Sequence, residues 1–272
     1  MRPVQSCPGL HALLPAVLEI AHAAGREIMD VYSREFAVEE KADRSPLTDA
    51  DLRSQARIIE GLAALTPAIP ILAEESAVVP HAERARWQEF WLVDPLDGTR
   101  EFVSRSPEFT VNIALVHDHR PVLGVVHVPA QRLDYYGGEG LGAFRRANDG
   151  PAISIHTRPQ AQSPVRVVGS KSHRGDSLDA LLTRIGPHEL KPVGSSLKMC
   201  LVAEGGADFY PRLGPTYEWD TAAGQAVVEF AGGYVTDLEG AALRYNTRPT
   251  LLNPHFIAYA DASRDWRRLV TG

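Results

Sequence analysis

Hydrophobic positions near the start of the chain recur every three or four residues, which predicts two amphipathic helices. The apolar positions of the first recur over residues 10–31. We expect this helix to begin near Pro15, because proline suits the first helical turn. The second is expected after Thr48, whose hydroxyl can cap a helix. Asp51 stands three residues later and completes the pattern of a capping box.

The pattern then changes to short apolar runs that are rich in β-branched residues, which predicts strands. The segment Asp118-His119-Arg120-Pro121 separates two of these runs and suits a hairpin connection. We therefore expect an antiparallel meander in the first half of the chain. The predicted strands there are residues 69–73, 90–94, 109–117, 122–128, the segment around Tyr135-Tyr136, and residues 153–155.

A segment rich in proline, glutamine and serine, residues 157–164, is typical of a linker. Helices and strands are expected to alternate after it. The predicted strands are residues 165–169, the segment near Val193, and residues 209–210, 234–237 and 256–260, and the predicted helices are residues 177–185, 197–204 and 221–231. We predict an α+β domain at 1–157 and an α/β domain at 158–272, with an active site between them.

The charge of the chain restricts the class of partner. The formal net charge of -6 argues against a nucleic-acid polymer, because proteins that bind one usually carry a basic surface. A small polyanion is compatible with this charge, since bound divalent cations can invert the field in an acidic pocket. We therefore expect a small, negatively charged ligand.

Several features predict a cytoplasmic protein. Charged residues interrupt every apolar stretch before it reaches the length of a bilayer. His11, Glu19 and His22 fall in the segment where a signal peptide would have its apolar core. The two cysteines match neither a zinc site nor a disulfide framework, and Cys200 is expected to be buried in an apolar helix.

Candidate chemistry begins at the turn that follows the strand at residues 90–94. Asp94 and Asp97 are expected to converge there, with Pro95 ending the strand. If a helix starts after Asp97, the N–H groups of Gly98 and Thr99 point into the same space, where they would attract phosphate. A cap for this helix and a closed turn are the alternative roles for the two aspartates.

Three acidic segments occur in a specific order along the chain. Glu74-Glu75 ends one predicted strand, Asp94-Pro95-Leu96-Asp97-Gly98-Thr99 ends the next, and Trp219-Asp220-Thr221-Ala222-Ala223-Gly224 begins a helix of small residues. This set resembles the signature of the inositol monophosphatase superfamily, and the resemblance runs from about Lys41 to about Gly233. It implies a layered αβαβα sandwich of the inositol monophosphatase and fructose bisphosphatase type, usually a homodimer. It also implies a magnesium-dependent, lithium-sensitive phosphatase.

The resemblance also implies a role for each acidic residue. Two or three Mg²⁺ ions would be held by Glu74, Asp94, the carbonyl of Leu96, Asp97 and Asp220. Asp51 and Thr99, together with Glu74, would prepare the attacking water. Carboxylate and carbonyl oxygens are the ligands that Mg²⁺ prefers, and a pair of ions suits phosphate ester hydrolysis. For Asp51, the capping box remains a purely structural alternative.

Within the superfamily, several segments resemble the bacterial 3'(2'),5'-bisphosphate nucleotidases: residues 100–105, 109–115, 169–174 and 194–200. The substrate would then be adenosine 3',5'-bisphosphate, losing its 3'-phosphate as part of sulfate assimilation. The substrate-binding residues implied are Glu74, Leu96, Asp97, Gly98, Thr99, His173, Ser195, Lys198, Arg212 and Asp220. Ser195 also suits a helix N-cap, while Lys198 and His173 also suit solvated surface positions.

One departure from the nucleotidase pattern leaves the substrate range open. Lys171 stands where arginine is commoner, and a lysine holds phosphate without a bidentate fork. An inositol or sugar monophosphatase is therefore the first alternative. A non-catalytic sensor of Mg²⁺ or nucleotide is the second, although Asp51 and Thr99 argue against it. Some bacterial relatives attach to the inner face of the membrane, but no basic amphipathic helix supports this here.

Overall fold

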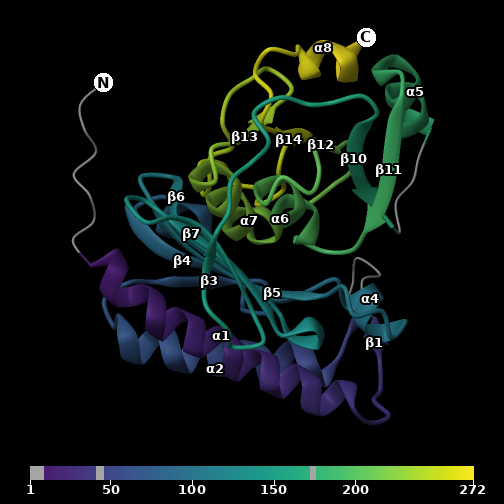
Figure 1. Ribbon diagram of the computed structural model, residues 1–272. Coiled ribbons are helices and arrows are strands. Elements are labelled where there is room, and N and C mark those ends of the chain that lie inside the picture. Colours follow the sequence, from purple (N-terminus) through teal and green to yellow (C-terminus); the bar gives the residue numbers. More distant parts are fainter. Residues whose placement is uncertain (1–8, 41–45, 172–175) are drawn as a thin grey trace.

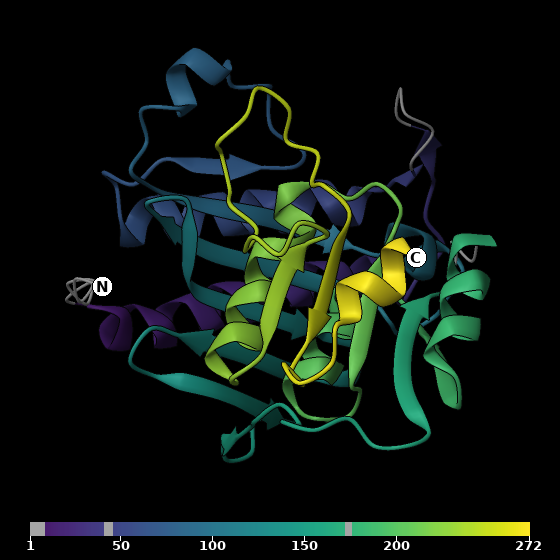
Figure 2. The same ribbon diagram turned by 90° about the horizontal axis from the view of Figure 1, so that it is seen from above.

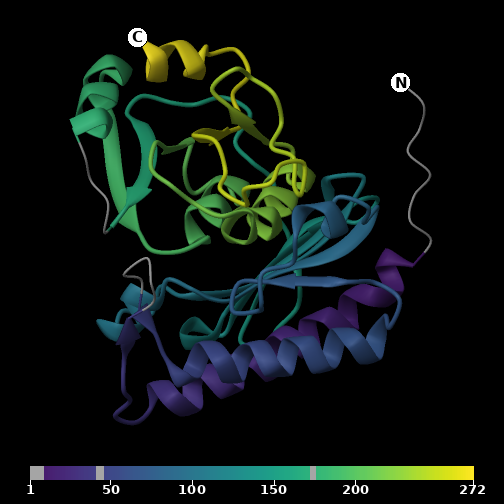
Figure 3. The same cartoon turned by 180° about the vertical axis from the view of Figure 1, so that it is seen from behind.

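The computed structural model describes residues 9–40, 46–171 and 176–272. Two long helices, α1 (Leu10–Tyr32) and α2 (Asp49–Leu65), lie side by side on one face of a large sheet (Figures 1 and 3). The sheet has seven strands, and all neighbouring pairs are antiparallel except β3 and β4. Its strand order is β3 (Ile71–Ala73), β4 (Glu89–Asp97), β5 (Thr110–His117), β6 (Arg120–Val128), β7 (Leu133–Gly138), β8 (Gly142–Ala147) and β9 (Ile153–Ser154).

A second sheet of five strands lies above the first in Figure 1, and in front of it in Figure 2. Its strand order is β11 (His188–Val193), β10 (Val165–Ser170), β12 (Phe209–Arg212), β14 (Phe256–Tyr259) and β13 (Tyr234–Asp237). Parallel pairs join β10 to both β11 and β12, whereas β14 is antiparallel to both of its neighbours. The other elements are β1 (Glu39–Glu40), β2 (Pro46–Leu47), α3 (His81–Arg84), α4 (Thr99–Val103), η1 (Pro129–Gln131), α5 (Asp176–Ile185), α6 (Leu197–Ala203), α7 (Glu218–Phe230) and α8 (Trp266–Thr271).

Apolar side chains alternate between the two faces of the strands and pack into three hydrophobic cores. Trp91 and Val93 face α1 and α2, while Leu92 of the same strand faces the second half of the chain. Helices α6 and α7 fill the space between the two sheets, and α5 and α8 cover the outer face of the second sheet. Five layers result, so the predicted αβαβα sandwich is confirmed.

Small residues let α7 pack unusually close to the first sheet. A Cβ atom added to Gly124 of β6 would lie 2.4 Å from the carbonyl oxygen of Ala223. Because α7 belongs to the second half of the chain, the two halves share one continuous core. The division into domains at 157 and 158 therefore stays a prediction, although each sheet falls within one of the two segments.

The hairpin between β5 and β6 is the predicted one, with a tighter turn. Asp118 and His119 both have positive φ angles, 47° and 63°, as a two-residue type I′ turn requires. Arg120 and Pro121 already belong to β6, and Val122 is the extra residue where the register between β5 and β6 shifts. The turn thus sets the register of the central strands.

Two predicted boundaries are wrong. Helix α1 begins at Leu10, five residues before Pro15, because Leu10 is buried in the core. Pro15 is exposed, so water can bond the carbonyl that the missing N–H leaves free. Strand β4 runs through Pro95 to Asp97, since a β-bulge between Asp94 and Asp97 removes the need for an N–H there.

Two further predictions are confirmed. Helix α2 begins after Thr48 with the predicted capping box, and Cys200 is buried. Strand β8 was not predicted, since Arg145 and Arg146 interrupt its apolar pattern. Among the described residues, no helix has both the length and the apolar character that a membrane span needs.

Candidate active site

A cavity of about 500 Å³ opens between the two halves of the molecule, at one end of the large sheet. Four acidic side chains that lie far apart in the sequence line it. Glu74 follows β3, Asp94 and Asp97 come from the bulge of β4, and Asp220 lies in the first turn of α7. The structure thus brings together all four acidic residues that the sequence suggested as metal ligands.

The bulge of β4 is held from behind by two hydrogen bonds. The N–H of Leu96 donates to Oδ1 of Asp94 at 3.0 Å, and the Ser54 hydroxyl of α2 donates to the carbonyl of Pro95 at 2.7 Å. Both interactions are buried. Asp94 and Leu96 both line the cavity.

The acidic residues raise one another's pKa. Burial raises the pKa of Asp94 well above its ordinary value, and the charges of Glu74, Asp97 and Asp220 add to this. The pKa of Asp220 is raised in the same way, by burial and by Asp97 and Glu74. Such a group of carboxylates is unfavourable when fully ionised, so the cavity is suited to a cation.

Asp97 is positioned by two residues that the sequence analysis did not identify. The Ser196 hydroxyl lies 2.7 Å from Oδ2 of Asp97 and 2.9 Å from the carbonyl oxygen of Asp220. The Asn112 amide donates to Ser196 Oγ at 2.8 Å, which leaves the serine hydrogen for one of those acceptors. Asn112 stands alone in the apolar run of β5, and that polar residue was the available signal.

Asp51 contributes from behind the cavity wall. Its Oδ2 atom accepts hydrogen bonds from the N–H and the hydroxyl of Thr48, both at 2.7 Å. Its Oδ1 atom lies 3.3 Å from the Thr99 hydroxyl, and that hydroxyl lies 3.2 Å from the carbonyl oxygen of Leu96. Asp51 therefore has the predicted capping role and also contacts Thr99, so the two interpretations are compatible.

Gly98 makes the turn from β4 into α4 possible. Its φ of 90° is rarely adopted by other residues, and an added Cβ would lie 3.1 Å from the carbonyl oxygen of Glu108. Helix α4 begins at Thr99, so the expected helix after Asp97 is present, though it has only five residues. Gly98 and Thr99 both line the cavity.

The basic side of the cavity is formed by residues of the second half. Lys198 is buried, and it donates to the carbonyl of Ser195 at 2.6 Å and lies over the ring of Tyr210. Burial lowers the pKa of Lys198 to about 8, against the opposing effect of Asp97. Arg212 donates to the carbonyl of Pro215, and within the described part of the chain its Nε atom has no hydrogen-bond partner.

His173, a predicted contact of the remote phosphate, lies outside the described residues. Lys171 is described and does not line the cavity. Lys171 lies 3.5 Å from the Glu108 carboxylate and 3.2 Å from the Ser106 hydroxyl, at an exposed position. Ser170, beside it, lines the cavity.

A layered sandwich with an acidic cavity between its sheets defines a class of metal-dependent phosphatases, and sequence comparison agrees. The family model described as "Inositol monophosphatase family" matches residues 10–268. The chain belongs to this family, as the sequence motifs predicted. The family model covers nearly the whole length of the chain, including every acidic residue of the cavity.

Named relatives give a finer comparison. The chain is 46% identical to a "3'(2'),5'-bisphosphate nucleotidase CysQ" of Salmonella typhimurium over 90% of its own length and 98% of the relative. Identity to the protein of that name from Escherichia coli K12 is 45%, with the same two coverages. The predicted resemblance to the nucleotidase branch is confirmed.

Solved structures of related proteins have the same fold as this chain. The crystal structure of CysQ from Bacteroides thetaiotaomicron has a TM-score of 0.80 and 36% identity, covering 94% of this chain and 99% of that one. An inositol monophosphatase from Thermotoga maritima has a TM-score of 0.79 and 27% identity, covering 96% of this chain and 97% of that one. The architecture is therefore shared by both branches of the family.

Proposed function

We propose that this chain is a Mg²⁺-dependent 3'(2'),5'-bisphosphate nucleotidase that converts adenosine 3',5'-bisphosphate to AMP and phosphate. The observation that carries the proposal is the convergence of four carboxylates on one cavity, with the Asp51 and Thr99 pair beside them. The identity to relatives of this name, 45–46%, supports the choice of substrate. The reaction would clear a by-product of sulfate assimilation.

The residues of the cavity fit bound Mg²⁺. Buried carboxylates with raised pKa values require a nearby positive charge to ionise, and all the candidate ligand atoms are oxygens. Two or three ions would be held by Glu74, Asp94, the carbonyl of Leu96, Asp97 and Asp220. When bound, they supply the positive charge that the phosphoryl oxygens need in the transition state.

The chain itself would handle the proton of the attacking water. The hydrogen bonds from Thr48 hold Oδ2 of Asp51, and Oδ1 lies 3.3 Å from the Thr99 hydroxyl, whose hydrogen it can accept. The lone pairs of the Thr99 hydroxyl then face the cavity and can accept a hydrogen bond from water. As the water attacks phosphorus, the bond between phosphorus and the 3'-oxygen breaks. The proton of the water passes to the Thr99 oxygen while the Thr99 proton passes to Asp51, and the departing 3'-oxygen takes a proton from solvent.

The second phosphate of the substrate would bind on the basic wall. Lys198 provides a buried point charge. Arg212 provides a planar cation on the same wall, with an Nε–H that has no partner among the described residues. Ser195 lies beside them, and His173 remains a predicted contact. This wall would favour a bisphosphate nucleotide over a monophosphate ester, because a monophosphate ester would leave the buried charge of Lys198 without a counterion.

The proposal is tested by comparing two substrates at saturating Mg²⁺. Phosphate release from adenosine 3',5'-bisphosphate is expected to have a higher kcat/KM than release from inositol 1-phosphate. A preference for inositol 1-phosphate would establish the inositol or sugar monophosphatase alternative. Tight nucleotide binding without any turnover would instead support the sensor. Inhibition by lithium, predicted from the family resemblance, is measured in the same assay.

Three predictions about oligomeric state, partners and cellular location accompany the proposal. We expect a homodimer in solution, no interaction with nucleic-acid polymers, and a cytoplasmic location, with peripheral attachment to the inner face of the membrane as the alternative. Light scattering of the purified protein tests the first. Fractionation of cells tests the last.

A further inference from the structure

A second group of possible ligands lies on the opposite face of the large sheet. His22 of α1, His127 of β6 and Asp134 of β7 each direct a side-chain atom toward a common point, and these atoms all lie within 4.8 Å of one another. His127 and Asp134 are on the α1 side of the sheet, together with Val125 and Tyr136. The group is thus separated by the sheet from the four carboxylates of the candidate active site.

Close contacts fix the orientation of these three side chains. Nδ1 of His127 lies 2.7 Å from Oδ1 of Asp134, and Nε2 of His22 lies 3.0 Å from both carboxylate oxygens. A Cβ added to Gly25 would lie 2.5 Å from Nε2 of His127, so α1 packs directly against that edge of the ring. Nδ1 of His127 is thus the ring nitrogen that faces Asp134.

The hydrogen bonds of this group cannot all be formed at once. Nε2 of His22 lies 3.0 Å from the Asp134 carboxylate, which only accepts hydrogen bonds, and 3.2 Å from Nη2 of Arg146, which only donates. One nitrogen of a neutral imidazole carries either a hydrogen or a lone pair. One of the two contacts is thus always unsatisfied, and a cation in place of the guanidinium would use the lone pair.

The residue types of this group suit a transition metal. Two imidazoles and one carboxylate form a ligand set that Zn²⁺ and similar transition metals prefer, whereas Mg²⁺ prefers oxygen ligands alone.

We propose that His22, His127 and Asp134 form a binding site for a Zn²⁺-type divalent cation, which displaces the guanidinium of Arg146. Arg146 now neutralises Asp134, with Nε 3.0 Å and Nη2 2.9 Å from Oδ2. Its side chain is 23% exposed, so it can turn into solvent. The group opens into a cavity of about 340 Å³, which leaves room for water as a fourth ligand.

Zn²⁺ binding to the purified protein tests this proposal, with saturating Mg²⁺ present and with a competing chromophoric chelator. One zinc equivalent is expected to bind in the native protein and in Asp94→Asn. His22→Gln and His127→Gln should weaken it at least about 100-fold, since a ligand is lost. Arg146→Met should bind zinc about tenfold more tightly, a change of about 1.4 kcal/mol, because the competing cation is removed.

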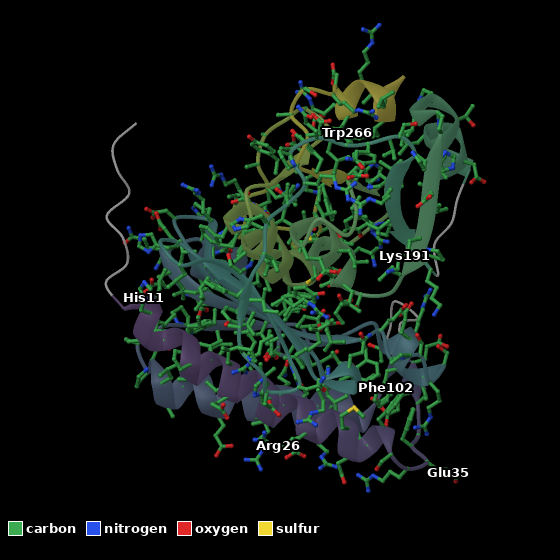
Figure 4. The ribbon with its side chains drawn as sticks, viewed as in Figure 1. His11, Arg26, Glu35, Phe102, Lys191 and Trp266 are labelled. Carbon is green, nitrogen blue, oxygen red and sulfur yellow. The ribbon has the colours of Figure 1, made fainter. Side chains whose placement is uncertain are left out.

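His11→Ala is the matched control, because His11 lies on the same helix and is exposed at its start (Figure 4). Circular dichroism shows that each variant is folded, since Asp94→Asn is expected to have no turnover. Zinc should also shift the ring ¹⁵N resonances of His22 and His127 but not those of His11. A zinc equivalent that survives His22→Gln, one that disappears in Asp94→Asn, or an unchanged affinity in Arg146→Met would overturn the proposal.

Discussion

The Thr99 hydroxyl lies 3.3 Å from Oδ1 of Asp51, although the two residues are 48 positions apart in the chain. One comes from the first turn of α4 and the other from the first turn of α2. Because the second carboxylate oxygen of Asp51 is held by Thr48, its first oxygen has a fixed direction. Asp51, which caps α2, is thereby placed to accept a proton from Thr99 at the start of α4.

Asp51→Asn tests that relay. An amide cannot take up the proton, so kcat should fall about 10²- to 10⁴-fold, which is the usual contribution of a positioned general base. The KM for substrate and the affinity for Mg²⁺ should change little, because Asp51 does not line the cavity. Steady-state kinetics at several Mg²⁺ concentrations measure all three.

Thr48→Ser is the matched control for Asp51→Asn, since it keeps the capping hydroxyl and the hydrogen bond to Asp51. It should retain kcat. Thr48→Ala should lower the free energy of unfolding by about 1 kcal/mol through loss of the cap. If Asp51→Asn keeps native turnover, the relay is wrong, whatever happens to stability.

Asp94→Asn is expected to abolish turnover and yet to stabilise the metal-free protein. The pKa of Asp94 is raised in the folded state, so its contribution to stability is present at low pH and is lost as the pH rises through that pKa. Asparagine cannot ionise, and it can keep the hydrogen bond from the N–H of Leu96. The metal-free variant should gain about 2–4 °C in Tm at pH 7, the effect of about 1 kcal/mol in a protein of this size.

Thermal unfolding with and without Mg²⁺ measures this effect. Mg²⁺ should raise the Tm of the native protein much more than that of Asp94→Asn, because binding stabilises only the folded state that holds the ions. At pH 4 the two metal-free proteins should differ little. A metal-free variant that is less stable than the native protein at pH 7 would show that Asp94 is not under electrostatic strain.

Lys198 should give the reaction a pH dependence that is specific to the second phosphate. Its lowered pKa of about 8 means that the ammonium loses its charge as the pH rises through that value. The kcat/KM for adenosine 3',5'-bisphosphate should therefore fall above pH 8. The value for adenosine 3'-monophosphate, which lacks the other phosphate, should not share this decrease.

The effect of Lys198 on the stability of the protein should depend on pH with the opposite trend. The cost of burying the charged lysine is fully present below about pH 8 and disappears as the pH rises toward its ordinary pKa. Lys198→Met should thus raise the Tm at pH 7, and its advantage over the native protein should shrink between pH 8 and 10. A constant difference in Tm across this range would contradict the assignment.

Ser196 is expected to act on metal affinity through Asp97. Ser196→Ala removes the hydroxyl that lies 2.7 Å from Oδ2 of Asp97, so the affinity for Mg²⁺ should fall about 10- to 100-fold, as is usual for residues that orient a ligand. Excess Mg²⁺ should restore kcat. Ser195→Ala is the contrasting variant, and it should raise KM while leaving the Mg²⁺ dependence unchanged.

Local signals in the sequence were sufficient for most of the elements. The capping box at Thr48, the turn at Asp118 and His119, and the alternation of apolar residues in β5 and β6 each depend on neighbours within a few residues. Helix α1 shows the limit of such signals. Burial of Leu10 against distant residues outweighs the local preference that placed the start near Pro15.

The acidic residues of the cavity could also be found from the sequence, because each follows an apolar strand or begins a helix of small residues. Their supporting partners could not. Ser196 lies 99 residues from Asp97, and His22 lies 112 residues from Asp134. Nothing in the local pattern of either residue specifies such a partner.

The sequence by itself therefore determined the order of the elements, the family, and which carboxylates are candidates for metal binding, since these depend on short-range periodicity and on motifs. Only the tertiary structure decided that β4 continues through Pro95, that Ser196 and Asn112 support Asp97, and that two histidines meet Asp134 behind the sheet. The physical reason is that hydrogen bonds and burial act between atoms that are close in space, and chain folding alone determines which distant residues become neighbours.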